Sequence, residues 1–198
     1  KLSKRKGAKP LTWYRDQQYL PDAVINYMAL IGWNPGTDQE IFTLDELVRV
    51  FDLSKVQKGG AIFDEEKLKW VNKEHLLKLP QAELEAKIKV KLDTKGGLTS
   101  EMITKITPII LERIHTFSDV DTMLQEGELD YVFADPTYDP KILYWKGIAD
   151  PENTKKRLSK VIELLSSLDE NNFKKDIIKD ALWGFATEEG KGEVLWPL

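Results

Sequence analysis

Apolar residues recur at helical spacing along almost the whole chain, and the segments that carry them begin at helix-capping residues. Thr43 and Glu46 form the pattern of a capping box. Asp64 and Thr99 stand where helix N-caps are expected, and Asp150 precedes a proline suited to a first helical turn. We find no alternating pattern typical of a strand and no internal repeat. Because caps and apolar stripes agree over so many segments, the sequence predicts an all-α fold.

The same signals predict where the helices lie. Helices are expected over residues 21–32 and about 81–92, after caps at residues 43, 64, 99, 118 and 150, and in a last segment that ends near residue 190. The first should bury a stripe of Val24, Ile25, Met28 and Ile31. We expect an interruption near Asn72 and a kink at Pro108. Helical spacing also assigns three tryptophans, Trp70, Trp145 and Trp183, to the core.

Charge is unevenly distributed along the sequence. Residues 1–15 hold six basic side chains and no acidic one, whereas residues 119–152 hold nine acids against two lysines. A polyanion such as ATP or RNA would be attracted to the first segment and repelled by the second. The acidic stretch is interpreted as a solvated face.

The composition argues against disulfides, metal sites and a membrane-spanning segment. The chain has no Cys, which excludes disulfides and thiolate metal sites and fits a reducing cytosol. Its two His residues are isolated, which argues against a histidine metal site, and no apolar run approaches the roughly 20 residues that span a bilayer.

The first seven residues, KLSKRKG, place amines, a hydroxyl and a glycine in one loop. Such a loop can surround phosphates, because Lys and Arg supply charge while Ser and backbone N–H groups donate hydrogen bonds. In a transferase these groups would stabilise the charge on a departing pyrophosphate. A solubilising or targeting tail has the same composition, so the loop alone leaves both interpretations open.

Residues 1–5, KLSKR, resemble the KMSKS signature of class I aminoacyl-tRNA synthetases, in the Leu and Arg variant common among glutamyl enzymes. Three blocks further along, at residues 19–33, 40–56 and 60–72, are similar to the helices that follow this loop in the family. Together these blocks cover about residues 1–80. The remainder resembles, more diffusely, the all-α anticodon-binding region of bacterial-type glutamyl-tRNA synthetases.

The resemblance implies a domain plan. Residues 1–79 would form the KMSKS-like loop and a stem-contact helical fold, and residues 80–198 a multi-helical anticodon-binding bundle. That bundle would have two subdomains, at about 80–147 and 148–198, the last one truncated. The chain would be the C-terminal, tRNA-binding part of a glutamate–tRNA ligase. The family's Rossmann domain, which binds glutamate and adenosine, is expected to lie outside this chain, so no catalytic set is complete and the chain alone is expected to be inactive.

The resemblance also implies roles for individual residues. Lys1, Ser3, Lys4 and Arg5 would bind the phosphates of ATP, which the parent enzyme uses with Mg²⁺, and no metal is expected to be held by this chain. Lys55, Lys58, Lys69 and Lys73 would contact the tRNA backbone without reading sequence. Ordinary solvated lysines remain the alternative for each of these four.

At the anticodon end, Arg113 would read a base, because its planar guanidinium can hydrogen-bond to an unstacked base and stack on it. The alternative is a helix-surface Arg that pairs with Glu112 or another nearby acid. Residues 192–198 resemble the loop that the family presents to the anticodon, which makes Trp196 and Leu198 candidate tRNA contacts.

The partners implied are tRNA-Glu, with tRNA-Gln left open as a second, and ATP and glutamate only with the missing domain. We expect a cytoplasmic monomer without a membrane partner. Two alternatives stay open on the residues alone. One is a stand-alone helical RNA-binding protein, and the other is a helical scaffold that uses its acidic face for a protein partner.

Overall fold

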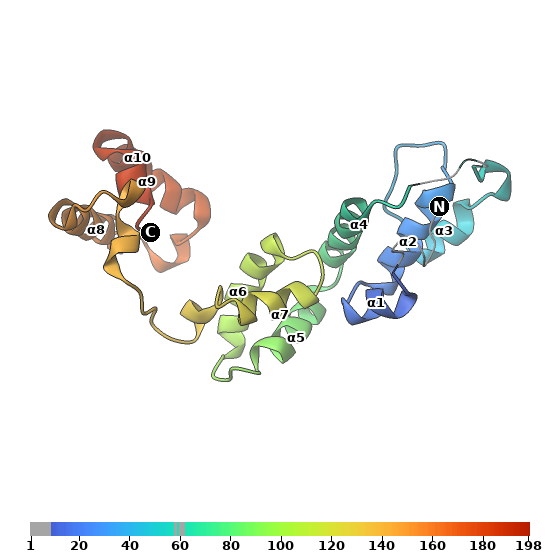
Figure 1. Cartoon of the computed structure of the whole chain (residues 1–198), viewed down its shortest axis with the longest axis horizontal. Helices are drawn as coiled ribbons and strands as arrows, with labels where there is room; N and C mark the ends of the chain where they lie inside the picture. Colours follow the sequence, from blue (N-terminus) through green and yellow to red (C-terminus); the bar gives the residue numbers. More distant parts are fainter. Residues whose placement is uncertain (1–8, 58, 60–61) are drawn as a thin grey trace. The chain divides into compact units, whose positions relative to one another are not determined.

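The structure, a computed structural model, describes residues 9–57, 59 and 62–198. Within these ranges it contains ten α-helices, α1 to α10, several short 3-10 turns and no β-strand (Figure 1). The predicted all-α fold is therefore confirmed. The chain divides into two compact units, Lys1–Asp135 and Pro136–Leu198, and each is described by itself. No helix in the described part is long and apolar enough to cross a membrane.

The first unit begins with four helices. They are α1 (Leu11–Asp16), α2 (Pro21–Gly32), α3 (Leu44–Val50) and α4 (Glu65–Leu77), with a 3-10 turn, η2 (Leu53–Lys55), between the last two. Thr43 and Glu46 form the predicted capping box, and the Asp64 carboxylate accepts hydrogen bonds from the first N–H groups of α4. The core between α2 and α4 consists of Tyr19, Ala23, Tyr27, Leu68 and Val71. Helix α3 contributes Leu47 to a small cluster of its own with Trp33 and Phe42.

The buried face of α2 matches the predicted one only in part: Val24 and Ile31 pack against the core as predicted, and Ile25 and Met28 do not. Ala23, Asn26 and Tyr27 are buried, whereas Ile25 and Met28 are 43% and 51% exposed. Asn26 can be buried because its amide is satisfied: Nδ2 donates to the Glu40 carbonyl, and Oδ1 accepts from the Phe42 N–H. A hydrogen-bonded Asn therefore turns the helix partly away from the stripe that apolar spacing predicts.

The predicted interruption of α4 near Asn72 is wrong, because the helix is continuous from Glu65 to Leu77. Asn72 is buried, and its side chain accepts a hydrogen bond from the Leu20 N–H and donates one to the His115 carbonyl. A residue interpreted as a helix breaker is therefore a buried polar link between α4 and two other segments.

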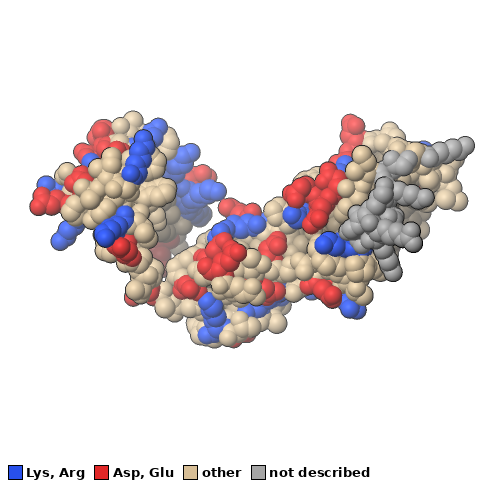
Figure 2. All heavy atoms as spheres, viewed as in Figure 1, with Lys and Arg blue, Asp and Glu red and all other residues tan. Residues whose placement is uncertain are grey.

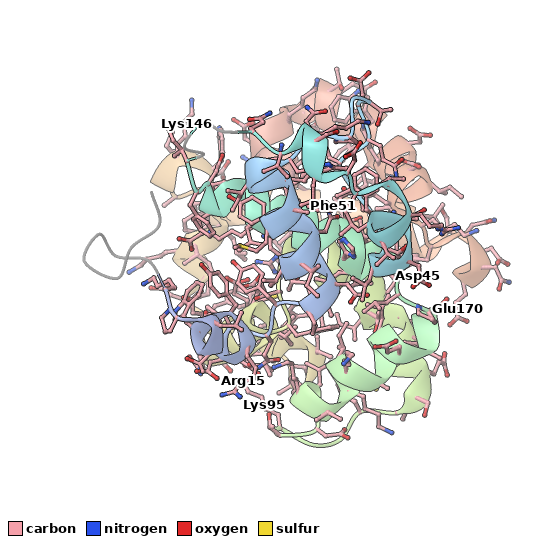
Figure 3. All side chains as sticks on the ribbon, turned by 90° about the vertical axis from the view of Figure 1, so that its right-hand side faces the viewer. Arg15, Asp45, Phe51, Lys95, Lys146 and Glu170 are labelled. Carbon is pink, nitrogen blue, oxygen red and sulfur yellow. The ribbon has the colours of Figure 1, made fainter. Side chains whose placement is uncertain are left out.

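The remainder of the first unit contains α5 (Gln81–Leu92), α6 (Ser100–Arg113), α7 (Ser118–Gln125) and the 3-10 turn η3 (Asp130–Val132). Figure 3 shows Arg15, in the last turn of α1, and Lys95, after α5, at the outside of this unit. The core includes Leu76 of α4, Ile88 and Leu92 of α5, and Ile103 and Ile110 of α6.

The helix ends of this part match the sequence prediction only in part. Thr99 caps α6 as predicted, and α6 is assigned as one helix through Pro108. The predicted cap at Ser118 and Asp121 is wrong. The residue before α7 makes no side-chain cap, and Asp119 instead accepts hydrogen bonds from the N–H groups of His115 and Thr116.

The second unit packs three helices, α8 (Pro151–Ser166), α9 (Lys175–Glu189) and α10 (Lys191–Leu195), around Val161, Leu182, Ala186 and Val194. Three 3-10 turns complete it: η4 (Pro140–Leu143), η5 (Trp145–Gly147) and η6 (Glu170–Asn172). Asp150 caps α8 by accepting from the Asn153 N–H. The last long helix stops at Gly190, whose φ of +106° suits glycine, so both predicted limits are confirmed.

The prediction that Trp70, Trp145 and Trp183 lie in the core is wrong, because none of them belongs to a buried core cluster. Trp70 is 40% exposed and Trp183 is 43% exposed, whereas Trp145 is half-buried. On α4 the inward face is taken by Leu68, Val71 and Leu76, and on α9 by Leu182. On α4 the buried face also holds the polar residues Asn72 and His75, so size and apolar character alone do not identify it. The predicted domain boundaries at 79/80 and 147/148 stay predictions.

Candidate nucleic-acid interface

The residues predicted to bind ATP phosphates, Lys1, Ser3, Lys4 and Arg5, lie outside the described residues, as does Lys58. The other predicted contacts fall on both units. Lys55, Lys69, Lys73 and Arg113 belong to the first unit, and Trp196 and Leu198 to the second. On the face that Figure 2 shows, basic and acidic side chains are interspersed on both units. The contacts of each predicted residue therefore indicate its possible role better than the net charge of its unit does.

Lys55 and Lys69 lie at the surface and each has a partner within the protein. The Lys55 ammonium, on η2, donates to the Pro35 carbonyl at 2.8 Å. The Lys69 ammonium, on α4, is 2.8 Å from the Glu66 carboxylate, and this hydrogen bond raises the pKa of Lys69. Because such exposed contacts are weak, both ammonium groups can exchange them for a phosphate.

Lys73 lies one helical turn after Lys69 on α4, and its ammonium points into the protein. It donates to the Leu111 carbonyl and, at 2.7 Å, to the Ile114 carbonyl at the end of α6. The last carbonyls of a helix have no partner within it, and a cation there also interacts favourably with the helix dipole. The Lys73 ammonium is partly removed from water, and this burial lowers its pKa.

Arg113 is the last residue of α6, and its Nη2 pairs with the Glu128 carboxylate. Its side chain is 48% exposed. A guanidinium carries five N–H donors, so one contact with Glu128 leaves donors for a further acceptor. The structure therefore shows the alternative interpretation, a helix-surface Arg that pairs with a nearby acid, and contact of Arg113 with a base stays a prediction.

Trp196 and Leu198 lie at the end of the second unit and are 57% and 60% exposed. The Trp196 indole donates to the Ile142 carbonyl at 2.8 Å, and its ring centroid is 5.5 Å from that of Trp145. A Cβ on Gly192 would lie 2.3 Å from the Trp145 ring, so only glycine allows this approach. Trp196 is therefore partly exposed and is held by Trp145 and by the Ile142 carbonyl.

One exposed aromatic group was missed by sequence reasoning. Trp183 on α9 has two ammonium groups near its ring, Lys179 at 5.4 Å and Lys191 at 4.1 Å from the centroid. The spacing of Lys179 and Trp183, four residues apart on one helix, was the available signal. Glu128 was also missed, because it lies in the turn after α7, 15 residues away from its partner Arg113 on α6. Among the described residues, no group of three or more His, Asp and Glu side chains is arranged as a metal site would need.

Comparison with known families matches the chain in two parts. Residues 1–70 match the family model described as tRNA synthetases class I (E and Q), catalytic domain, and residues 66–198 match that of an anticodon binding domain. A chain that joins these two parts is of the class I tRNA synthetase type.

Curated relatives narrow the class. The chain is 38% identical over 215 residues to the glutamate–tRNA ligase of Flavobacterium johnsoniae, covering 100% of this chain and 41% of that protein. It is 35% identical over 204 residues to that of Clostridium novyi, covering 100% of this chain and 40% of the relative. The chain belongs to the glutamate–tRNA ligase family. It spans about two fifths of the length of these relatives, and the part that it matches is their C-terminal part.

Solved structures agree. A glutamate–tRNA ligase from Elizabethkingia meningosepticum, solved in complex with its amino acid, matches with a TM-score of 0.68 and 33% identity, over 93% of this chain and 35% of that one. The glutamate–tRNA synthetase from Elizabethkingia anophelis matches with a TM-score of 0.60 and 31% identity, over 91% and 34% of the two chains.

Proposed function

We propose that this chain binds tRNA-Glu and reads its anticodon, as part of an enzyme that uses ATP to attach glutamate to that tRNA. The observation that carries the proposal is the geometry of Arg113. This residue ends α6, its side chain is half-exposed, and its contact with the Glu128 carboxylate involves one nitrogen of a guanidinium that carries five N–H donors. An unstacked base offers the acceptors that such a group needs.

The remaining contacts divide between backbone and base. Lys55, Lys58 and Lys69 would neutralise phosphates of the tRNA without reading sequence. Trp196 and Leu198 would offer exposed apolar surface to anticodon bases, because an indole is a good stacking partner for any base. In this plan residues 1–79 contact the tRNA stem and residues 80–198 the anticodon arm.

The ATP-dependent step would use Lys1, Ser3, Lys4 and Arg5 around the phosphates, with Mg²⁺ arriving with ATP. Glutamate and adenosine need a further domain. Since the described residues include no strand–turn–helix unit, the chain by itself should not catalyse exchange between ATP and pyrophosphate. The enzyme would act in the cytoplasm as a monomer, and charging of tRNA-Gln would depend on how strictly Arg113 selects its base.

Binding measurements test the proposal. We would measure the Kd of the chain for a tRNA-Glu transcript and for transcripts with each anticodon base changed in turn, over a range of salt concentrations. The expected result is salt-dependent binding that weakens for at least one changed base. Arg113→Gln should remove that preference, a loss of about 1–3 kcal/mol if the contact is bidentate.

Arg49→Gln is the matched control, because Arg49 is an exposed Arg whose Nε donates to the Asp45 carbonyl at 3.1 Å. It should leave the preference between transcripts unchanged. A chain that binds RNA with strong salt dependence but no anticodon preference would instead be a general RNA-binding protein. A chain with no tRNA affinity, and little effect of salt, would fit the scaffold alternative.

A further inference from the structure

Two neighbouring side chains of α4 hold three backbone carbonyls on either side of Arg113. Lys73 donates to the carbonyls of Leu111 and Ile114, and Asn72 donates to that of His115. Asn72 is fully buried, and Lys73 is partly buried. The backbone that carries Arg113 is therefore attached to α4 two residues before it and at the two residues after it.

Most of the hydrogen-bonding capacity of the Lys73 ammonium is used within the protein. An ammonium has three N–H donors, and two of them point to the end of α6. Burial lowers its pKa, although Asp119, Glu112 and Glu74 act in the opposite direction. A lysine that reached a phosphate would keep its ammonium in water, as Lys69 does one turn earlier. Lys73 therefore does not suit the direct backbone contact that the sequence predicted.

Arg113 is held at both ends of its side chain. The carbonyls bound by Lys73 and Asn72 fix the backbone beneath it, and Glu128 pairs with the guanidinium at its tip. Hydrogen bonding to a base depends on position to within about 0.5 Å, so a supporting contact at the backbone can decide how well the guanidinium selects.

We propose that Lys73 is a positioning residue: its ammonium fixes the end of α6 so that Arg113 meets one anticodon base, and it does not itself contact RNA. The proposal rests on the function proposed above. It also assigns a second task to Asn72, which bonds the Leu20 N–H at the start of α2. Through Asn72 and Lys73, α4 connects the α2 side of the first unit to the residue that would read the anticodon.

The test compares three variants of the whole chain with the wild type. Lys73→Met keeps most of the side-chain length and removes the charge and the donors, Lys73→Arg keeps both, and Lys69→Met removes an exposed lysine of the same helix. For each variant we would measure Kd for the tRNA-Glu transcript and for the anticodon-changed transcript that the wild type disfavours most, at several salt concentrations. Thermal melting shows whether each variant is folded at the assay temperature.

We expect Lys73→Met to reduce the ratio of the two affinities by at least about fivefold, the lower end of a bidentate base contact. The slope of log K against log salt should stay that of the wild type, and Lys73→Arg should restore most of the ratio. Lys69→Met should do the reverse, weakening both transcripts alike and lowering the slope by about 0.7–0.9 for one lost phosphate contact. If Lys73→Met does not fold, Lys73→Gln, which removes the charge and keeps two N–H donors on a shorter side chain, replaces it.

A Lys73→Met variant that loses affinity equally for both transcripts, with a reduced salt slope, would show a direct phosphate contact and overturn the proposal. An unchanged affinity ratio in that variant would overturn it as well. If the wild type itself does not distinguish the transcripts, the failure lies with the proposed function of Arg113, and the inference fails with it.

Discussion

Replacing Asn72 with Ala tests the physical account of α4 most directly. The substitution removes two hydrogen bonds made by a side chain that is fully buried. It leaves the Leu20 N–H, previously bonded at 2.8 Å, without its partner. A buried donor without a partner costs about 1–3 kcal/mol. The His115 carbonyl adds less, because His115 is an exposed residue and water can replace the amide. We therefore expect a loss of about 2–4 kcal/mol in the free energy of unfolding, a large part of the 5–15 kcal/mol typical of a domain.

The assay must follow the first unit by itself, because two compact units can unfold in separate transitions. Native-state hydrogen exchange of amides in α4 and α6 reports the local free energy of opening. Asn34→Ala is the matched control. The Asn34 side chain accepts from the Gly36 N–H at 2.7 Å in an exposed turn, so its loss should cost no more than about 1 kcal/mol. An equal loss in the two variants would refute the view that Asn72 is a buried cross-link.

Two further predictions concern glycines and pH. Gly192→Ala should destabilise the second unit by about 1–3 kcal/mol, because its Cβ would lie 2.3 Å from the Trp145 ring. In contrast, Gly184→Ala should stabilise α9 by about 0.5–1 kcal/mol, because a Cβ there meets nothing within 4 Å; urea unfolding of both variants checks the opposite signs. Burial lowers the pKa of His75, so the unfolded chain binds its proton more readily than the folded one, and stability should fall as pH drops below about 6.5. In His75→Gln, the urea midpoint of unfolding should depend less on pH between about pH 5.5 and 7.5 than in the wild type. An unchanged pH dependence would contradict the view that His75 causes it.

Eight of the ten helices in the described part could be predicted because the signals that set them are local, whereas the short helices α1 and α10 were missed. The capping box at Thr43 and Glu46 involves residues three apart, and the glycine stop at Gly190 depends on one backbone angle. The buried faces could not be predicted in the same way. Whether Asn26 or Ile25 turns inward on α2 depends on backbone groups of residues 40 and 42, which come close only in the folded chain.

The candidate site shows the same limit. Lys69 and Lys73 are alike in the sequence, four residues apart on one helix, yet one faces water and the other the end of α6. Nothing local distinguishes them, because the carbonyls that draw Lys73 inward lie about 40 residues further along the chain. Arg113 could be singled out through the family resemblance, whereas Glu128, which holds its guanidinium, could be identified only from the structure.

Together, Asn72, Lys73 and His75 give α4 a role that apolar packing cannot supply. His75 Nε2 lies 2.9 Å from the Asn26 amide oxygen on α2, while Asn72 and Lys73 bond backbone groups before α2 and at the end of α6. Apolar contacts between helices tolerate small shifts along the helix axis, whereas a buried polar group is satisfied in one register and costly in others. Apolar substitutes of similar size at these three positions could keep the burial, but they would leave the backbone groups without partners and would not fix the register. What the polar residues add is a single placement of α6, and with it of Arg113, relative to the part of the chain that would dock on the tRNA stem.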